Sequence, residues 1–252
     1  MTAGHDGVQR SRGRRRDSAD AAGEAFTVLV VCTGNVNRSA LGAVLLDTWS
    51  GWYLPSAMRD QVRIGSAGLR APAGSSMGPR AQVIAEALGA DGSRHRAVQI
   101  TDDTIRAADL VLVSSARQRE SVLGLVPGAL RSTFTIREAG RIAESLAELP
   151  APASPEEMRR VVAALAENRT VDDADDGEDD IVDPQGKDDE SYRIMARQEV
   201  PPLASLAGVL FGMPAAEIAA YGEAAQAAEF DFTGDGAVAP ESSPGSGGRH
   251  RA

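Results

Sequence analysis

The residues of this chain that are most able to do chemistry lie in one short segment, Cys32-Thr-Gly-Asn-Val-Asn-Arg38, which Ser39 follows. Cys32 supplies a thiol, whose thiolate form is a strong nucleophile. Arg38 supplies a planar guanidinium that can bind two oxygens of a phosphoryl group at once. The backbone N–H groups of a loop that contains Gly34 can turn inward around an anion. The segment therefore predicts a nucleophile beside an oxyanion-binding loop.

The segment lies between a predicted strand and a predicted helix. Residues 26–31 form a continuous apolar run rich in β-branched residues, which is typical of a strand buried on both faces. From Ser39 onward, apolar residues recur at helical spacing. The positive end of this helix dipole points at the loop and favours the thiolate of Cys32. The Ser39 hydroxyl is placed to form a hydrogen bond with the sulfur.

The pattern of strand, loop and helix repeats along the chain. Further strands are predicted at residues 62–66, 109–114 and 132–136, with helices between them. This alternation predicts an α/β fold, a single three-layer domain with a four-stranded parallel sheet flanked by helices. Sites in such folds lie at the carboxyl ends of the strands, where Cys32 is placed.

The carboxyl-terminal half of the chain is expected to be mainly helical. A capping box with proline at the first helical position predicts a helix from residue 154 to about 168. Another helix is predicted from about residue 188 to 210, and Pro201-Pro202 must break or kink it. An alanine-rich helix is predicted at residues 214–230.

Composition separates a central domain, residues 25–211, from two tails. Residues 1–24 have almost nothing to bury and predict a disordered basic arm rather than an export signal. Residues 170–187 form an acidic loop within the domain. Residues 212–252 are expected to contain the alanine-rich helix and then a flexible, disordered tail.

The bulk properties of the chain exclude several classes of partner. The chain has 252 residues and a formal net charge of −10, which disfavours nucleic acid and acidic membrane surfaces. No stretch approaches the roughly 18 apolar residues that a membrane helix needs. The one cysteine cannot form an internal disulfide, which indicates a reduced, cytoplasmic setting. No cluster of Cys and His residues predicts a metal site.

Residues 31–39, Val-Cys-Thr-Gly-Asn-Val-Asn-Arg-Ser, resemble the phosphate-binding loop of the low-molecular-weight protein tyrosine phosphatases. Other segments resemble that family in the same order along the chain. They are Ser66-Ala-Gly68, His95-Arg-Ala-Val-Gln-Ile100 and Asp183-Pro184. The resemblance covers roughly residues 26–211, and the loop is its most specific part.

The resemblance implies a phosphatase that hydrolyses phosphotyrosine-type monoesters through a cysteinyl-phosphate intermediate, without metal or organic cofactor. It implies Cys32 as nucleophile, Arg38 as phosphate clamp and Asp183 as general acid. It also implies a hydrogen-bond network that holds the loop, formed by Asn35, Ser39, Ser66 and His95. The phosphate-binding residues it implies are Thr33, Gly34, Asn35, Val36, Asn37, Arg38 and Ser39.

Asp183 and His95 also have simpler interpretations. Asp183 follows a run of acidic residues, and such runs are usually solvated loops; the apolar pair at 181–182 and Pro184 favour a fixed general acid instead. A lone histidine between arginines is more often a surface residue, and the neighbouring family-like segments favour a role for His95 in the network.

Two positions depart from the family pattern. Asn37 stands where many members carry a second cysteine, so oxidised Cys32 would have no neighbouring thiol. Gln185 stands where many members place an aromatic wall, which weakens the case for phosphotyrosine in particular. Val36 stands where phosphoarginine phosphatases tend to carry threonine, and an apolar residue suits an aromatic substrate better.

Two alternatives to a tyrosine phosphatase remain at this point. One is an arsenate reductase of the same fold that needs a single cysteine and uses a low-molecular-weight thiol. The other is a non-catalytic phosphate-recognition module, which would be expected to lack Cys32 or Asp183. The expected partners are phosphotyrosine proteins or peptides, and the resemblance implies a tyrosine kinase of polysaccharide synthesis among them.

Overall fold

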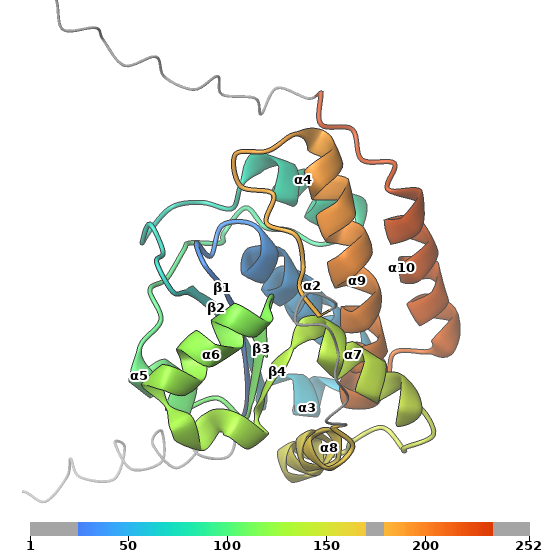
Figure 1. The fold of residues 1–252 in the computed structure, drawn as a ribbon. Coiled ribbons are helices and arrows are strands. Elements are labelled where there is room, and N and C mark those ends of the chain that lie inside the picture. Colours follow the sequence, from blue (N-terminus) through green and yellow to red (C-terminus); the bar gives the residue numbers. More distant parts are fainter. Residues whose placement is uncertain (1–24, 170–178, 234–252) are drawn as a thin grey trace, which may run out of the picture.

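Four parallel strands form the centre of the computed structural model, which describes residues 25–169 and 179–233 (Figure 1). The strands are β1 (Phe26–Cys32), β2 (Val62–Gly68), β3 (Leu110–Val113) and β4 (Thr133–Thr135), in the order β2-β1-β3-β4. The predicted four-stranded parallel sheet is therefore confirmed. The predictions for residues 1–24, for residues 170–178 of the acidic loop and for residues 234–252 lie outside the described residues.

Strand β1 lies in the interior of the sheet and pairs with both β2 and β3. Its side chains alternate between two apolar clusters, with Val28 and Val30 in the larger and Leu29 and Val31 in the smaller. This burial on both faces explains the unbroken apolar run of its sequence. The register pairs Cys32 with Gly68, so the thiol lies at the carboxyl end of the sheet, beside the end of β2.

Helices cover both faces of the sheet (Figure 1). The smaller cluster contains buried residues from α5, α6 and η1, whereas the larger cluster draws on α2, α4, α7, α8, α9 and α10. The helices are α2 (Arg38–Tyr53), α3 (Ser56–Arg59), α4 (Pro79–Ala87), α5 (Asp102–Arg106), α6 (Ala116–Leu125), the 3₁₀ helix η1 (Pro127–Arg131), α7 (Ile136–Ser145), α8 (Pro155–Glu167), α9 (Asp189–Phe211) and α10 (Ala215–Ala227).

Helix α9 continues through Pro201 and Pro202, so of the predicted break or kink, the break is wrong. A proline inside a helix removes one backbone hydrogen bond and costs about 3 kcal/mol or more. Val200 and Leu203, on either side of the prolines, are fully buried in the larger cluster. Tertiary packing along the whole helix outweighs this local cost. The helix propensities of the individual residues do not reveal such packing.

Helix α10 packs along α9 at the right of Figure 1. The ring of its Tyr221 lies 4.7 Å from that of Trp49 on α2, measured between centroids. The alanine-rich stretch is therefore a helix that packs against the folded core. Within residues 25–169 and 179–233, no helix is long and apolar enough to cross a membrane.

The closest approach of α7 to α9 depends on the absence of a side chain at Gly140. A Cβ added there would lie 2.8 Å from the carbonyl oxygen of Pro202 and would overlap its Cα and Cβ. We expect Gly140→Ala to lower the free energy of unfolding by about 1–3 kcal/mol, because the two helices would have to separate.

Gly222 is the matched control for this change, because it lies within α10 and a Cβ there would meet no atom within 4 Å. Gly222→Ala should raise the free energy of unfolding by about 0.5–1 kcal/mol through helix propensity alone. Urea denaturation of both variants provides the measurement. Wild-type stability in Gly140→Ala would contradict the close packing of α7 on α9.

Candidate active site

The sulfur of Cys32 lies at the end of β1 and forms hydrogen bonds with the loop and the helix that follow it. The Asn35 backbone N–H donates to Sγ at 3.2 Å, and the Ser39 Oγ lies 3.0 Å from the same atom. The residue is only 2% exposed. A backbone N–H and a hydroxyl therefore meet at the sulfur that the sequence predicts as the nucleophile.

Asn35 fixes the conformation of the loop through its backbone and its side chain. Its φ of 54° lies in the left-handed region, which asparagine tolerates better than most residues. Its side-chain Nδ2 donates to Ser39 Oγ at 2.9 Å, and its Oδ1 accepts from the Val98 N–H at 2.8 Å. The His95 Nε2 lies 2.8 Å from the Asn35 carbonyl oxygen. Asn35, Ser39 and His95 thus form a network that holds the backbone behind the sulfur.

Ser66 is not part of this network. Among the described residues its side chain makes no hydrogen bond to Asn35 or His95, because β2 continues two residues further and presents Gly68 to the loop. A Cβ on Gly68 would lie 2.8 Å from the Thr33 carbonyl oxygen and 3.0 Å from the Asn35 nitrogen. The residue of the Ser-Ala-Gly segment that shapes the loop is therefore the glycine.

The loop encloses a cavity of about 250 Å³. Of the predicted phosphate-binding residues, Asn35 and Ser39 are fully buried and do not line it. Their positions indicate support of the loop rather than contact with a ligand. The cavity is lined by Cys32, Thr33, Gly34, Val36, Asn37, Arg38, Pro72, Asp183 and Gln185.

Arg38 brings the two ends of the candidate site together. Its guanidinium is nearly buried, and Nη1 donates to the Ile181 carbonyl oxygen at 3.2 Å. Its Nη2 forms an ion pair with Asp183 Oδ2 at 2.5 Å. The structure therefore places the predicted general acid beside the predicted phosphate clamp, at the wall of the cavity that contains the thiol.

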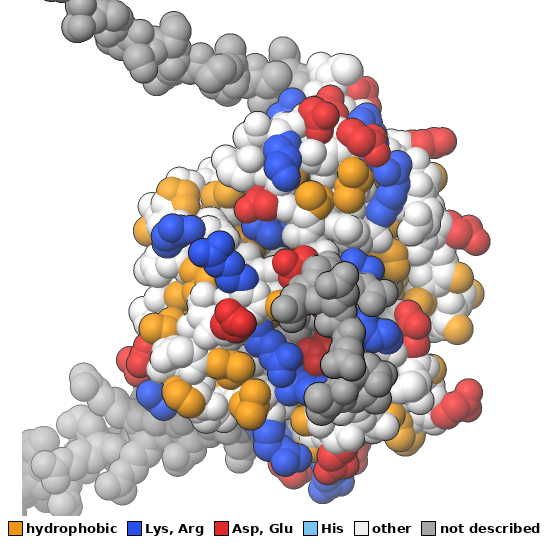
Figure 2. Space-filling model, in the orientation of Figure 1, with side chains coloured by type: hydrophobic (Ala, Val, Ile, Leu, Met, Phe, Trp, Pro, Cys, Tyr) orange, Lys and Arg blue, Asp and Glu red, His pale blue; other side chains and the backbone are white. Residues whose placement is uncertain are grey.

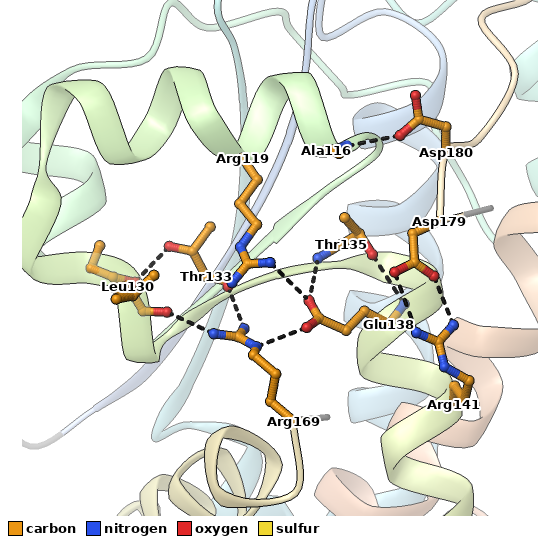
Figure 3. Close-up of polar contacts among 11 residues, drawn as sticks. Ala116, Arg119, Leu130, Thr133, Thr135, Glu138, Arg141, Arg169, Asp179 and Asp180 are labelled. Atoms are coloured by element: carbon orange, nitrogen blue, oxygen red, sulfur yellow. Dashed lines mark hydrogen bonds and ion pairs between the residues drawn. The ribbon is translucent and has the colours of Figure 1, made fainter. Parts of the chain in front are cut away.

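The segment before Asp183 is fixed to the body of the protein by charged side chains (Figure 3). Arg141 on α7 donates to both carboxylate oxygens of Asp179, at 2.7 and 3.3 Å. Asp180 Oδ1 accepts from the Ala116 N–H at 2.8 Å, at the amino-terminal end of α6. A carboxylate there is favoured by the helix dipole and by the otherwise unpaired N–H groups.

Backbone hydrogen bonds continue this attachment up to the candidate acid. The Ile181 N–H donates to the Ser114 carbonyl oxygen at 2.9 Å, and the Val182 N–H donates to Gln198 Oε1 at 2.8 Å. Ile181 is buried in the larger apolar cluster. Asp183 is therefore not part of a loosely solvated loop, and the apolar pair before it has the fixing role that the sequence predicts.

A second charged network lies around Glu138, which is buried at the start of α7 (Figure 3). Its carboxylate accepts from the Thr135 N–H within a capping box and from Arg169 Nε at 2.7 Å. Arg169 also donates to the carbonyl oxygens of Leu130 and Thr133. Its guanidinium lies 4.2 Å from the ring centroid of Phe134. These contacts fix the chain after α8 against β4 and α7.

The two departures from the family pattern contact each other. Asn37 Nδ2 donates to Gln185 Oε1 at 2.8 Å, so the residue after Pro184 is hydrogen-bonded to the phosphate-binding loop. The Gly78 N–H donates to the Val36 carbonyl oxygen at 2.8 Å, and a Cβ on Gly78 would overlap Asn37 Oδ1. One wall of the cavity is consequently formed by two amide side chains.

Glu199 is a residue of the site region that the sequence analysis missed. It lies on α9 with no exposed surface, and neither carboxylate oxygen has a hydrogen-bond partner among the described residues. Burial raises the pKa of this carboxyl well above its usual value, and the positive charge of Arg38 opposes that shift. The sequence could have indicated this burial, because Glu199 falls at helical spacing within an apolar stripe. The stripe consists of Tyr192, Met195, Leu203, Leu206 and Leu210.

Metal binding has no support in the described part of the chain. No group of three or more His, Cys, Asp or Glu side chains in residues 25–169 and 179–233 is placed to hold a metal ion.

Comparison with known proteins identifies a family. The family model described as low molecular weight phosphotyrosine protein phosphatase matches residues 27–168. A relative from Ralstonia nicotianae, named probable low molecular weight protein-tyrosine-phosphatase EpsP, is 35% identical over 112 residues. That match spans 44% of this chain and 71% of the relative.

Solved structures share the fold. The crystal structure of the tyrosine phosphatase AmsI from Erwinia amylovora matches with a TM-score of 0.52 and 22% identity, over 74% of this chain and 93% of that chain. The arginine phosphatase YwlE from Geobacillus stearothermophilus matches with a TM-score of 0.50 and 26% identity, over 72% of this chain and 90% of that chain.

The role of Asn35 can be tested by separating its backbone conformation from its hydrogen bonds. Both Asn35→Ala and Asn35→Gly lose the side-chain hydrogen bonds to Ser39 and Val98. Alanine also has a Cβ, which is unfavourable in the left-handed region, whereas glycine adopts that conformation freely. We expect both variants to bind inorganic phosphate at least about tenfold more weakly. The alanine variant should also be about 1 kcal/mol less stable than the glycine variant.

Calorimetric titration with phosphate and urea denaturation measure the two effects. Unchanged phosphate affinity in both variants would show that the network does not shape the anion-binding loop.

Glu199 predicts a specific dependence of stability on pH. The pKa of Glu199 is raised in the folded state, so as pH rises this carboxyl loses its proton in the unfolded chain before it does so in the folded protein. The free energy of unfolding therefore falls as pH rises from about 4.3 through the pKa of the folded state. Glu199→Gln removes this dependence. Its stability relative to wild type should rise by up to about 1.4 kcal/mol per pH unit in that window.

Urea denaturation from pH 4 to pH 8 tests this, with Glu120→Gln on the exposed face of α6 as the matched control. A stability difference that does not change with pH for Glu199→Gln, or an equal change for the control, would contradict the assignment.

Proposed function

This chain belongs to the low molecular weight phosphotyrosine protein phosphatase family, and from that premise we propose which of its residues carry the reaction. Cys32 is the nucleophile, Arg38 holds the phosphoryl group, and Asp183 is the general acid and base. The observation that carries the proposal is the cavity of about 250 Å³ that all three residues line.

The first step transfers the phosphoryl group to the enzyme. The Cys32 thiolate attacks phosphorus in line with the leaving oxygen, forming the P–S bond as the P–O bond breaks. Arg38 and the loop N–H groups hold the non-bridging oxygens, where negative charge is spread in the transition state. Asp183 gives its proton to the departing phenolate oxygen.

The second step returns the enzyme to its starting state. Asp183 takes a proton from a water molecule, whose oxygen attacks phosphorus as the P–S bond breaks. The leaving thiolate is stabilised by the two donors already in place at its sulfur, the Asn35 N–H and the Ser39 hydroxyl. The products are inorganic phosphate and free Cys32 thiolate.

Because Arg38 forms an ion pair with Asp183, substrate binding at Arg38 would also release the Asp183 carboxylate. A phosphoryl group carries up to two negative charges and matches the guanidinium fork with two oxygens, so it competes with the Asp183 carboxylate for Arg38. Displacement leaves Asp183 at the mouth of the same cavity, with its side chain 47% exposed. Asp183 is then free to take up the proton that it delivers to the leaving group.

The cavity favours an aromatic phosphate ester. The sulfur is almost fully buried, so a substrate must reach into the cavity, which Val36 and Pro72 help to line. An aryl phosphate is long enough for this and places apolar ring surface against both. Two amides, Asn37 and Gln185, replace the aromatic wall that many members carry, so we expect weaker contact with the ring.

The alternatives each lack a supporting feature. An arsenate reductase with an internal thiol relay needs further cysteines, and Cys32 is the only one. An arsenate reductase that uses an external thiol needs no general acid. The position of Asp183 at the cavity therefore supports a phosphatase instead. Phosphoarginine stays a candidate substrate because a relative named protein-arginine-phosphatase, from Geobacillus stearothermophilus, is 30% identical over 113 residues. Val36 favours the aryl ester.

The cellular setting follows from the chemistry of the thiol. We propose action in the cytoplasm, where a lone catalytic cysteine stays reduced. We propose phosphotyrosine proteins as substrates, and a tyrosine kinase of polysaccharide synthesis is the candidate that the sequence resemblance supplies.

The roles of Cys32 and Asp183 predict different kinetic losses. Cys32→Ser should lower kcat on a phosphotyrosine peptide by roughly 10⁴-fold or more. Asp183→Asn should lower it by about 10²–10⁴-fold, and by much less on an aryl phosphate whose leaving group needs no proton. Asp60→Asn, at the exposed end of α3, is the control and should keep the wild-type rate.

The same assay compares phosphotyrosine peptide, phosphoarginine and arsenate with thiol. Turnover by wild type no greater than that of Cys32→Ser on every substrate would rule out the catalytic role.

A further inference from the structure

A larger hollow of about 810 Å³ adjoins the catalytic cavity. The two share Thr33, Arg38 and Asp183 as lining residues, so the hollow lies next to the site. Its other walls come from the residues just after β2, the length of α6, the segment before Asp183 and Gln198 of α9. Figure 2 shows basic side chains on the face above α6.

Two arginines of this hollow belong to segments that are hydrogen-bonded to Thr33. The Arg70 N–H donates to the Thr33 carbonyl oxygen at 2.8 Å, which places the Arg70 backbone directly against the catalytic loop. Arg117 lies in the first turn of α6, next to Gln118, whose Nε2 donates to Thr33 Oγ1 at 3.2 Å. Both arginines line the hollow.

The charges of the hollow do not cancel. Arg70 and Arg117 are exposed, and neither side chain has an ion-pair or hydrogen-bond partner in residues 25–169 and 179–233. Of the two acids that line the same hollow, Asp183 is paired with Arg38, whereas Asp180 accepts a hydrogen bond from the neutral Ala116 N–H and keeps its negative charge. Two unpaired guanidinium groups against one unpaired carboxylate leave this described lining with a net positive charge, although the whole chain carries −10.

The remaining lining suits a peptide. Leu69, Leu125 and Val182 offer apolar surface, and Ser115 and Gln118 offer polar groups to a backbone. A small phosphate ester would occupy only the catalytic cavity, whereas the residues beside a phosphotyrosine extend beyond it, and the adjoining hollow has room for them.

We propose that this hollow binds the peptide segment next to the phosphorylated residue, and that Arg70 and Arg117 select substrates with acidic residues in that segment. The inference rests on the proposed phosphatase function and names the class of substrate for the same site.

Electrostatics favours a local effect. At physiological ionic strength charges are screened beyond about 8 Å, so a carboxylate in the hollow interacts with the two arginines more than with the distant negative charge of the chain. Exposed ion pairs of this kind contribute roughly a two- to fivefold preference each.

The test compares two phosphotyrosine peptides that differ only in their flanks, one with Asp and Glu and one with Asn and Gln at the same positions. The measured quantity is the ratio of kcat/KM for the acidic peptide to that for the amide peptide, at low and at high salt. We expect a ratio of about 5–20 in wild type at low salt, falling toward one at high salt.

Arg70→Gln and Arg117→Gln should each lower this ratio, and the double variant should bring it close to one. Arg63→Gln is the matched control, because Arg63 is an exposed arginine of β2 that lines neither cavity, and it should keep the wild-type ratio. A wild-type ratio of one, or a ratio that survives in the double variant, overturns the inference.

Hydrolysis of a simple aryl phosphate by wild type separates the two claims. If wild type hydrolyses that ester and the peptide ratio is one, only the proposed selection by the two arginines is contradicted. No activity on any ester contradicts the proposed function itself.

Discussion

The guanidinium of Arg38 is in contact with both segments that make up the active site. It lies in the loop that begins at Cys32, donates to the Ile181 carbonyl oxygen and pairs with the Asp183 carboxylate. A nearly buried positive charge is stable only when other groups compensate it. The need to compensate this charge therefore holds Asp183, the proposed general acid, beside the loop of Cys32, the proposed nucleophile. In the proposed reaction a phosphoryl dianion displaces Asp183 from the same guanidinium.

The fold supplies what this arrangement requires. Strand β1 is fixed by partners on both sides, so the thiol at its end has a defined position, and the loop after it is shaped by Asn35 and by the bare backbone of Gly68. The segment before Asp183 is tied to α6, α7 and α9. Glu199, which interacts electrostatically with Arg38, is a buried carboxyl whose raised pKa favours the neutral form, so Asp183 rather than Glu199 compensates the charge of Arg38.

Local patterns in the sequence were enough to predict the sheet, most helices and the oxyanion loop, whereas the involvement of Asn35 and His95 in a network came from the family resemblance. The features that were missed depend on packing between distant segments. Proline content favours a broken α9, but burial along the whole helix keeps it intact. The Ser-Ala-Gly segment indicates that β2 meets the loop, but only the register shows that Gly68 makes the contact.

The central claim is that phosphate passes through a covalent bond to Cys32. The most direct measurement is mass spectrometry of peptides from Asp183→Asn protein that is rapidly quenched during turnover of an aryl phosphate with a good leaving group, since this variant should still form the intermediate but hydrolyse it slowly. The account predicts a phosphate group on the peptide that contains Cys32. Turnover with no phosphorylated peptide, or with phosphate on another residue, would contradict it.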